Sequence, residues 1–423
     1  MKKFFAKIRL IFKDRVLRNR ILFVLGSLIV FRLLSAIPIP GVDSTRLTEF
    51  FANNQFLGLL NIFSGSGLSS LSIVMIGVAP FITASIVMQL LTVMVPRLKE
   101  MYHEEGEAGR KKFAQYSRLL TIPLAIIQGV GFVILFQNQG IIEPLGTFQF
   151  VTNICVVVAG SLLLTWIGEL ISEFGIGNGV SIIIFAGIVS SIPSFASQLA
   201  FTYDPSQIPL YLGFIIVAII IVAGVVVVTE AERPIPITYA KRVRGNKVYG
   251  GVSTYLPLRV NQSGVMPIIF ALSILLFPQM IVNFLSNTPN EIVASVSQFV
   301  LNILSNQWFY GIAYFVLVFL FTYFYTAITF DPETISTNLQ KSGAFIPGVR
   351  PGDSTSSHIG NVLNRITLVG AVFLGVIAVL PIIMQGITGL SALAIGGTGL
   401  LIVVSVVLDL VKKVDAQVTM REY

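Results

Sequence analysis

Long runs of apolar residues, separated by short polar stretches, recur along the whole of this 423-residue chain. An α-helix rises about 1.5 Å per residue, so roughly 20 apolar residues cross the ~30 Å hydrocarbon core of a bilayer. Hydrophobic residues make up 54% of the chain and charged residues only 11%, too few to cover a soluble domain of this size with polar surface. The pattern therefore predicts a polytopic α-helical membrane protein.

Ten apolar windows, bounded by proline, glycine and charged residues, are candidate membrane spans. The first follows a basic N-terminal segment, as the apolar part of a secretory signal would. Pro38 and Pro40 stand where a small-residue cleavage site would be, so we expect a retained span. The ten windows have their centres near Leu28, Ala84, Ile127, Val158, Phe185, Ile219, Phe270, Val318, Phe373 and Val403.

Basic residues orient these spans, because Lys and Arg in short loops stay on the cytoplasmic side of a membrane. Of the 28 Lys and Arg residues, eight precede the first span and three follow the tenth. Six lie between the second and third spans, six between the sixth and seventh, and three between the eighth and ninth. Only Arg32 and Arg46 lie elsewhere. This bias predicts an even number of spans with both termini in the cytoplasm. The loop from Glu169 to Asn178 has no basic residue, so its cytoplasmic position rests on parity alone.

Two cytoplasmic segments are too long and too polar to be simple turns. The first projection, Glu230 to Asn261, alternates apolar and polar residues on both sides of Gly245 and Asn246, which predicts a projecting hairpin. The second projection, Phe330 to Arg365, is expected to continue the eighth helix and to end in a tip rich in proline and glycine, Gly343 to Gly352.

The sequence excludes several kinds of membrane enzyme. Both histidines, His103 and His358, fall in predicted loops, so neither is expected to form a catalytic dyad within the membrane. His103 is followed by Glu104, but no second histidine completes an H-E-x-x-H zinc motif. The spans contain no paired aspartates, and no nucleotide-binding motif follows the glycines at 175, 177 and 179. We therefore predict no enzyme activity, catalytic residue, metal or cofactor.

The near absence of charge inside the spans argues against a proton-coupled transporter, since such residues are costly in a membrane and are kept for function. Sodium sites built from carbonyls and hydroxyls would escape this test, so a secondary transporter with inverted repeats stays open, as does a structural membrane scaffold. A transporter would show saturable uptake of a small solute by the purified chain in liposomes.

The segment from Asn61 to Ser72, NIFSGSGLSSLS, is too small and too polar to span a membrane alone. Within a bilayer such a backbone survives only when it is buried in protein or lines a cavity. It is either an ordinary outer loop or a short re-entrant helix in a pore, and the residues themselves leave both interpretations open.

Several sequence blocks, in order along nearly the whole chain, resemble the SecY family, the pore subunits of the Sec protein-translocation channel, and the bacterial members most. The blocks are IPIPGVD (Ile37 to Asp43), NIFSGSGLSSLSIVMIGVAPFITASIVMQLLT (Asn61 to Thr92), EGEAGRKKFAQYSR (Glu105 to Arg118), GIGNGVSIIIFAGIV (Gly175 to Val189), YAKR (Tyr239 to Arg242), LPLRVNQSGVMPIIFA (Leu256 to Ala271), GAFIPGVRPGD (Gly343 to Asp353) and GGTGLLIVVSVVLD (Gly396 to Asp409).

The resemblance implies an all-α clam-shell of ten transmembrane helices in two inverted halves, 1–200 and 201–423, plus a re-entrant plug helix at 61–72. It implies a passive channel through which unfolded secretory polypeptides pass. Signal sequences would leave sideways into lipid between the second and seventh spans.

The family's constriction ring would be formed here by aliphatic residues. Residues at i and i+4 lie on one face of a helix, so both pairs in this set can point inward together. Without the resemblance, each would be interpreted as an ordinary packing or lipid-facing residue. Val78 stands where isoleucine is more usual in the family. The constriction ring comprises Val78, Ile82, Ile184, Ile188, Ile269 and Ile402.

The plug segment implied by the resemblance is 61–72. Its glycines make it a poor isolated helix, since each costs about 1 kcal/mol relative to alanine, and this marginal stability would help the channel to open. The residues that we assign to the plug are Asn61, Phe63, Gly65, Gly67, Ser69 and Ser72.

The resemblance also implies a lateral gate and docking surfaces. Simple packing between helices is the alternative interpretation of each polar gate residue, and topology alone would also place basic residues in the projections. The gate residues are Thr83, Gln89, Gln128, Asn261 and Phe277, and the docking residues are Lys241, Arg242, Arg244, Lys247 and Arg350.

The partners implied by the family are SecE, SecG, the SecA motor ATPase, the translating ribosome, polypeptides that carry signal sequences, and membrane lipids. The driving force must come from SecA or the ribosome, because the chain has no nucleotide-binding motif of its own. The expected location is the bacterial plasma membrane.

Overall fold

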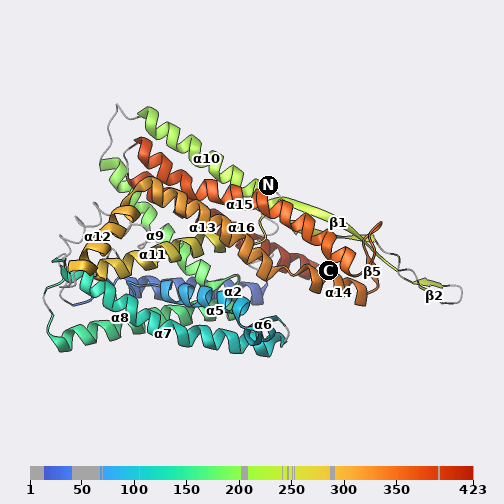
Figure 1. Cartoon of the computed structure of the whole chain (residues 1–423), viewed down its shortest axis with the longest axis horizontal. Coiled ribbons are helices and arrows are strands. Elements are labelled where there is room, and N and C mark those ends of the chain that lie inside the picture. Colours follow the sequence, from blue (N-terminus) through green and yellow to red (C-terminus); the bar gives the residue numbers. More distant parts are fainter. Residues whose placement is uncertain are drawn as a thin grey trace.

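A computed structural model describes residues 14–40, 67–68, 70–103, 105–138, 140–143, 145–201, 208–240, 242–244, 247–249, 251, 253–285, 291–388 and 391–422. All ten predicted span centres lie within helices of this structure (Figure 1). These helices are α2 (Arg15–Ser35), α5 (Ala79–Met94), α7 (Gly106–Asn138), α8 (Thr147–Phe174), α9 (Gly179–Phe201), α10 (Ile208–Glu230), α11 (Met266–Leu285), α13 (Gln307–Thr329), α15 (Asp353–Thr388) and α16 (Ser391–Glu422).

Four described stretches are long and apolar enough by themselves to cross a membrane: α7, α8, α15, and α13 together with α14 (Pro332–Lys341). There is a fifth such stretch if α5 and α6 (Pro96–His103), which are bent by 114° at their junction, are counted as one span. Shorter apolar stretches lie in α9, α10, α11 and α12 (Glu291–Ser305). The chain is a multi-pass membrane protein.

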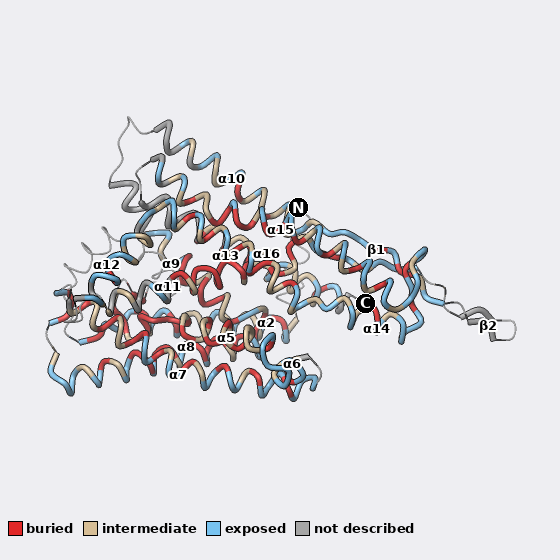
Figure 2. Tube along the Cα trace, viewed as in Figure 1, coloured by how far each residue is buried: buried red, intermediate tan, exposed pale blue. Residues whose placement is uncertain are grey.

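The helices form an elongated bundle with strands projecting from one end (Figure 1). Buried residues follow its interior, and exposed residues its outside (Figure 2). One apolar cluster runs through the interior and takes residues from α5, α8, α9, α11, α13, α15 and α16. Large apolar side chains are also exposed on the outside, among them Ile219 on α10 and Leu320 on α13. A surface of this kind suits contact with lipid.

Both ends of the described chain lie on one side of the bundle. Leu17 at the start of α2, Ile176 between α8 and α9, and Val418 near the end of α16 pack into one small apolar cluster. The connection between α8 and α9, which has no basic residue, is therefore on the same side of the bundle as the two ends of the described chain. The sequence-based boundary of this loop was too early, because Glu169 to Phe174 still belong to α8.

The two projections share one fold. Strand β1 (Glu232–Tyr239) lies between β4 (Ser253–Arg259) and β5 (Ala344–Phe345), antiparallel to both. Ile235, Leu258, Ile346 and Ile359 form their common core. Further out, β2 (Arg242–Arg244) pairs with β3 (Lys247–Tyr249), and Arg244 lies opposite Lys247. The predicted hairpin is confirmed, whereas the predicted continuation of the eighth helix is interrupted at Phe330 and Asp331 before α14 begins.

One helix was not anticipated from the sequence. The amphipathic α12 (Glu291–Ser305) lies between α11 and α13, at the end of the bundle opposite β2 (Figure 1). It does not match the pattern of a membrane span, about 20 apolar residues, because it has only 15 residues and carries polar side chains along one face.

The non-helical stretch 70–78, just before α5, packs against α8. A Cβ added at Gly160 would collide with the carbonyl oxygen of Ile73, so only glycine permits this approach. One residue further, the Ser161 hydroxyl donates a hydrogen bond to the Gly77 carbonyl at 2.7 Å in a fully buried environment. Glycine and serine in α8 thus provide the space and the hydrogen bond that a non-helical backbone needs inside a bundle.

Replacing Gly160 with alanine should force α8 away from this stretch and destabilise the protein by about 1–3 kcal/mol. Thermal unfolding of the purified protein in detergent would show this as a lower Tm. The matched control is Gly26→Ala in α2, where an added Cβ meets nothing within 4 Å. An equal Tm for Gly160→Ala and Gly26→Ala would contradict the close packing.

Candidate functional site

The six residues predicted for the constriction ring are all buried, with at most 6% of each residue exposed. Val78 caps the start of α5 and Ile82 lies one turn further on. Ile184 and Ile188 lie on α9, Ile269 on α11 and Ile402 on α16. All six belong to the same apolar cluster. That these side chains, rather than their neighbours in the cluster, face a passing chain stays a prediction.

The helices that carry these residues also meet across the bundle. Among the described elements, α11 packs on α5 and on α7, and α16 packs on α9. Each of these contacts joins a helix from the first five spans to one from the last five. The six aliphatic residues therefore lie on helices that border the two contact regions, which we call the α5/α11 seam and the α9/α16 seam.

The predicted plug segment is only partly within the described residues. Asn61, Phe63, Gly65 and Ser69 lie outside them, whereas Gly67 and Ser72 lie inside. The described part forms turns and is deeply buried: Leu68, Leu71 and Ser72 are fully enclosed. The Ser72 backbone N–H and hydroxyl both donate to the Gly67 carbonyl, at 2.9 and 3.1 Å.

A short extended pairing holds the end of this segment. The Ile39 N–H donates to the Leu71 carbonyl at 2.8 Å, and the Ile73 N–H to the Ile37 carbonyl at 3.0 Å. The Ser70 hydroxyl adds a bond to the Ser35 carbonyl at 2.8 Å. The I-P-I-P sequence favours this geometry, because proline fixes its own φ and biases the preceding residue toward extended backbone.

Leu71 has a φ of +40°, in the left-handed region that side chains other than glycine rarely adopt. Residues held in such conformations cost of order 1–3 kcal/mol and persist only when the surroundings impose them. Here the pairing with Ile39 and complete burial impose it. The base of the plug segment is thus fixed to the end of α2.

The predicted gate residues make local hydrogen bonds in the part of the chain that the structure describes. The Thr83 hydroxyl donates to the Ala79 carbonyl one turn earlier, at 3.0 Å. The Gln89 Nε2 donates to the Ser85 hydroxyl at 3.2 Å, and the Gln89 Oε1 is buried with no hydrogen-bond partner. Both bonds stay within α5, so they do not tie α5 to α11.

The remaining gate residues are placed differently from one another. Asn261 lies before α11, where its Nδ2 donates to the Gly264 carbonyl at 3.2 Å and its Oδ1 accepts from the Ser263 hydroxyl at 3.2 Å. Gln128 is buried on α7. Phe277 lies on α11, and its side chain is outside the description. Asn261 therefore orders the entry into α11 rather than bridging two helices.

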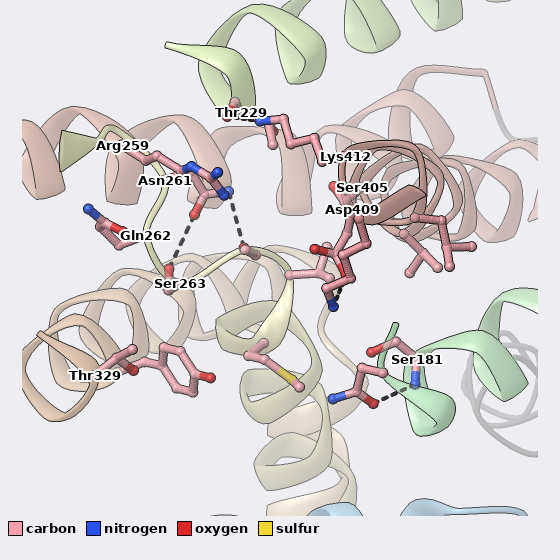
Figure 3. Close-up of a pocket in the computed structure, with 18 of the residues that line it drawn as sticks. Ser181, Thr229, Arg259, Asn261, Gln262, Ser263, Thr329, Ser405, Asp409 and Lys412 are labelled. Carbon is pink, nitrogen blue, oxygen red and sulfur yellow. Dashed lines mark hydrogen bonds and ion pairs between the residues drawn. The ribbon is translucent and has the colours of Figure 1, made fainter. Parts of the chain in front are cut away.

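A cavity of about 260 Å³ opens at the strand-bearing end of the bundle (Figure 3). Its lining comes from α9, α10, α13, α16 and the connection from β4 to α11. The Asn178 Oδ1 accepts from the Ser181 N–H at 3.2 Å, and Lys412 pairs with Glu230 at 2.9 Å. No single stretch of sequence contains this site, so sequence patterns alone missed it.

The lining of this cavity combines polar and apolar side chains, with Ser405 and Asp409 beside Val406 and Leu410 on α16. It contains no histidine or cysteine, and no group of three metal-ligating side chains lies among the described residues. Lys413 is neutralised by Asp409 at 2.6 Å.

Four of the five predicted docking residues lie within the described parts of the projections. Arg242, Arg244 and Lys247 lie on β2 and β3, with side chains outside the description, and Lys241 lies outside the described residues. Arg350 is exposed. Its carbonyl accepts a bond from the Thr355 hydroxyl at 2.9 Å, and the Ser336 hydroxyl bonds the Gly352 carbonyl at 2.7 Å. The second projection thus presents Arg350 on a fixed backbone.

The chain is similar over nearly its whole length to known proteins. A family model described as SecY matches residues 72–411. The protein translocase subunit SecY of Thermotoga maritima is 43% identical, over 97% of this chain and 95% of the relative. That of Synechococcus elongatus is 41% identical, over 96% of this chain and 93% of the relative.

Solved structures share the fold at lower identity. The structure of a protein conducting channel aligns with a TM-score of 0.63 and 18% identity, covering 94% of this chain and 92% of that chain. A structure of SecY concerned with its plug domain and the closed state aligns with a TM-score of 0.65 and 20% identity, covering 94% and 92%. At these identities the likeness establishes the fold.

Replacing Gln89 with methionine should stabilise the protein by about 1 kcal/mol, since it removes a buried carbonyl oxygen that has no partner. The Tm of the purified protein in detergent measures this. Thr83→Val serves as control, because the Thr83 hydroxyl is already satisfied within its own helix and its loss should give no comparable gain. A lower Tm for Gln89→Met would show that Gln89 makes a stabilising contact.

Proposed function

The chain belongs to the SecY family and is a protein translocase subunit, a channel for polypeptides rather than an enzyme; from this premise we propose which of its residues form the pore, the gate and the docking surfaces. The observation that carries the proposal is the burial of six aliphatic side chains on the helices that border both seams. The single chain would thus supply both the seal and the path of the translocated polypeptide.

The two halves of the channel are residues 1–200 and 201–423, related by a pseudo-two-fold axis in the membrane plane. The seams support this division, because α5, α7 and α9 of the first half meet α11 and α16 of the second. Each half has five spans, an odd number, so the halves have opposite orientations. Both termini lie in the cytoplasm, and the membrane is the bacterial plasma membrane. The basic-residue bias and the bacterial relatives support these assignments.

The constriction ring seals the resting channel. A narrow ring of branched apolar side chains resists wetting and yields around a passing chain without binding it. The plug segment lies against this ring at rest. Support comes from Leu68, Leu71 and Val74, which share the apolar cluster with Val78. The pairing of residues 37–39 with 71–73 would hold the base of the plug at the end of α2 when the channel opens.

The lateral gate is the α5/α11 seam. The local hydrogen bonds of Thr83, Gln89 and Asn261 support a seam closed mainly by apolar packing. Lipid tails are as apolar as the packed side chains, so helices in a membrane associate without a strong hydrophobic driving force. A hydrophobic signal sequence could therefore replace α11 as the neighbour of α5 at small cost in free energy.

The two projections dock cytoplasmic partners. The basic tip, Lys241, Arg242, Arg244 and Lys247, suits the phosphates of ribosomal RNA, and its binding would weaken as salt rises. The Sec61 of a canine ribosome-channel complex shares this fold. Arg350 engages the SecA motor, and SecE and SecG complete the complex. These partners supply the driving force.

Replacing Ile402 with asparagine should weaken the seal, because an amide in the ring favours water in the constriction. We expect a higher resting ion conductance in planar bilayers and export of substrates with defective signal sequences. Ile402→Leu, which keeps the ring apolar, is the matched control. Normal conductance together with normal rejection of defective signals in Ile402→Asn would contradict the role of this residue.

Replacing Arg350 with glutamate should abolish translocation driven by SecA, because the change reverses the charge on a fixed tip without altering its backbone bonds. ATP-dependent import of a secretory precursor into reconstituted vesicles measures the effect. Lys341→Glu makes the same charge reversal on an exposed residue of the same projection and should leave import largely intact. Import by Arg350→Glu at the wild-type rate would refute the assignment.

A further inference from the structure

Helix α12 carries an apolar stripe that the rest of the described chain does not cover. Ile292, Val296 and Phe299 are 75%, 58% and 65% exposed. Their spacing of four and then three residues puts them on one face of the helix. Three large apolar side chains exposed on one face of a helix that packs on α11 and α13 need a neighbour that is itself apolar.

The other faces of α12 have different surroundings. Ser295, Gln298 and Asn302 are exposed on a polar face, and at 100° per residue this face lies beside the apolar stripe. Ser297 is buried, and α12 packs on both α11 and α13. The helix therefore has one side on the protein, one polar side and one exposed apolar side, which is the arrangement of a helix at a membrane surface.

The next helix along the chain, α13, also carries exposed apolar side chains. A single residue, Asn306, separates α12 from α13, and its side chain caps α13 by accepting from the Trp308 N–H at 3.0 Å. Trp308 is 74% exposed, and Ile312 and Leu320 continue the exposed apolar surface along α13. Tryptophan is enriched at membrane–water interfaces, so the junction of α12 and α13 marks that level.

We propose that α12 is an interfacial helix whose occupant on the exposed face is the acyl chains of the outer leaflet, with Ile292, Val296 and Phe299 inserted among them. The assignment to the outer leaflet rests on the topology proposed above, whereas the lipid contact itself does not. The chain has no basic residue between Arg259 and Lys341. The attachment is therefore made by apolar burial alone and does not need anionic lipid.

This contact with lipid would be coupled to the lateral gate through packed helices. Helix α12 packs on α11, and α11 packs on α5 and α7. The outer end of the α5/α11 seam would therefore be connected, through two described helices in contact, to the surface of the outer leaflet. Lipid packing in that leaflet would bias how readily α11 moves away from α5.

Site-directed spin labelling tests the lipid contact directly. The full-length protein, purified with its accompanying subunits, would carry Cys155→Ser to remove its only cysteine, which is exposed on α8. Single cysteines would replace Ile292, Val296 or Phe299 on the stripe, and Ser295, Gln298 or Asn302 as matched controls on the polar face. Nitroxide accessibility to oxygen, which concentrates in lipid, and to a water-soluble nickel chelate would be compared in phosphatidylcholine vesicles with and without phosphatidylglycerol.

The proposal predicts that stripe positions favour oxygen over the nickel chelate, that control positions show the reverse, and that phosphatidylglycerol changes neither. Equal nickel accessibility on both faces would overturn it, since the stripe would then be in water. Protection from both reagents would overturn it in favour of a protein partner, and dependence on phosphatidylglycerol would overturn apolar attachment. None of these outcomes depends on translocation, so failure here is distinct from failure of the pore and gate assignments.

Discussion

The hydrocarbon core of a membrane offers no water to satisfy backbone N–H and C=O groups, and the architecture of this chain follows from that constraint. Helices meet it within each span. The stretch 70–78 is not helical, and it is tolerated because α8 leaves room for it at Gly160 and donates a hydrogen bond to it from Ser161. The pairing of residues 37–39 with 71–73 satisfies more of its backbone. These contacts let irregular backbone lie inside the bundle.

The same solvent sets how the channel can open. Inside lipid, apolar packing between helices differs little in free energy from packing against acyl chains. The proposed opening between α5 and α11 needs few polar bonds across this seam, and the hydrogen bonds of Thr83 and Gln89 stay within α5. Ion pairs are found instead at the strand-bearing end, as between Arg118 and Glu169 and between Lys412 and Glu230.

Much of the fold could be predicted from the sequence, because each span and the hairpin tip are local patterns. All ten span centres lie in helices, and the tip strands pair with Arg244 opposite Lys247. Features formed by distant residues could not be predicted in this way: the pairing of Ile37 with Ile73, the place of β5 beside β1, and the cavity at the strand-bearing end. Helix α12 was missed because 15 amphipathic residues match no span-length window. The pore and gate residues were predicted from the family resemblance, because the sequence itself does not distinguish them from ordinary packing residues.

The central claim is that a polypeptide crosses the membrane through the ring of aliphatic residues. A photo-crosslinking amino acid placed at Ile188 or Ile402, and at lipid-facing Ile219 or Leu320 for comparison, would be activated while a secretory precursor is arrested in transit. The account predicts crosslinks to the arrested chain from the first pair and not from the second. Crosslinks from Ile219 or Leu320 at equal yield, or none from Ile188 and Ile402, would contradict it.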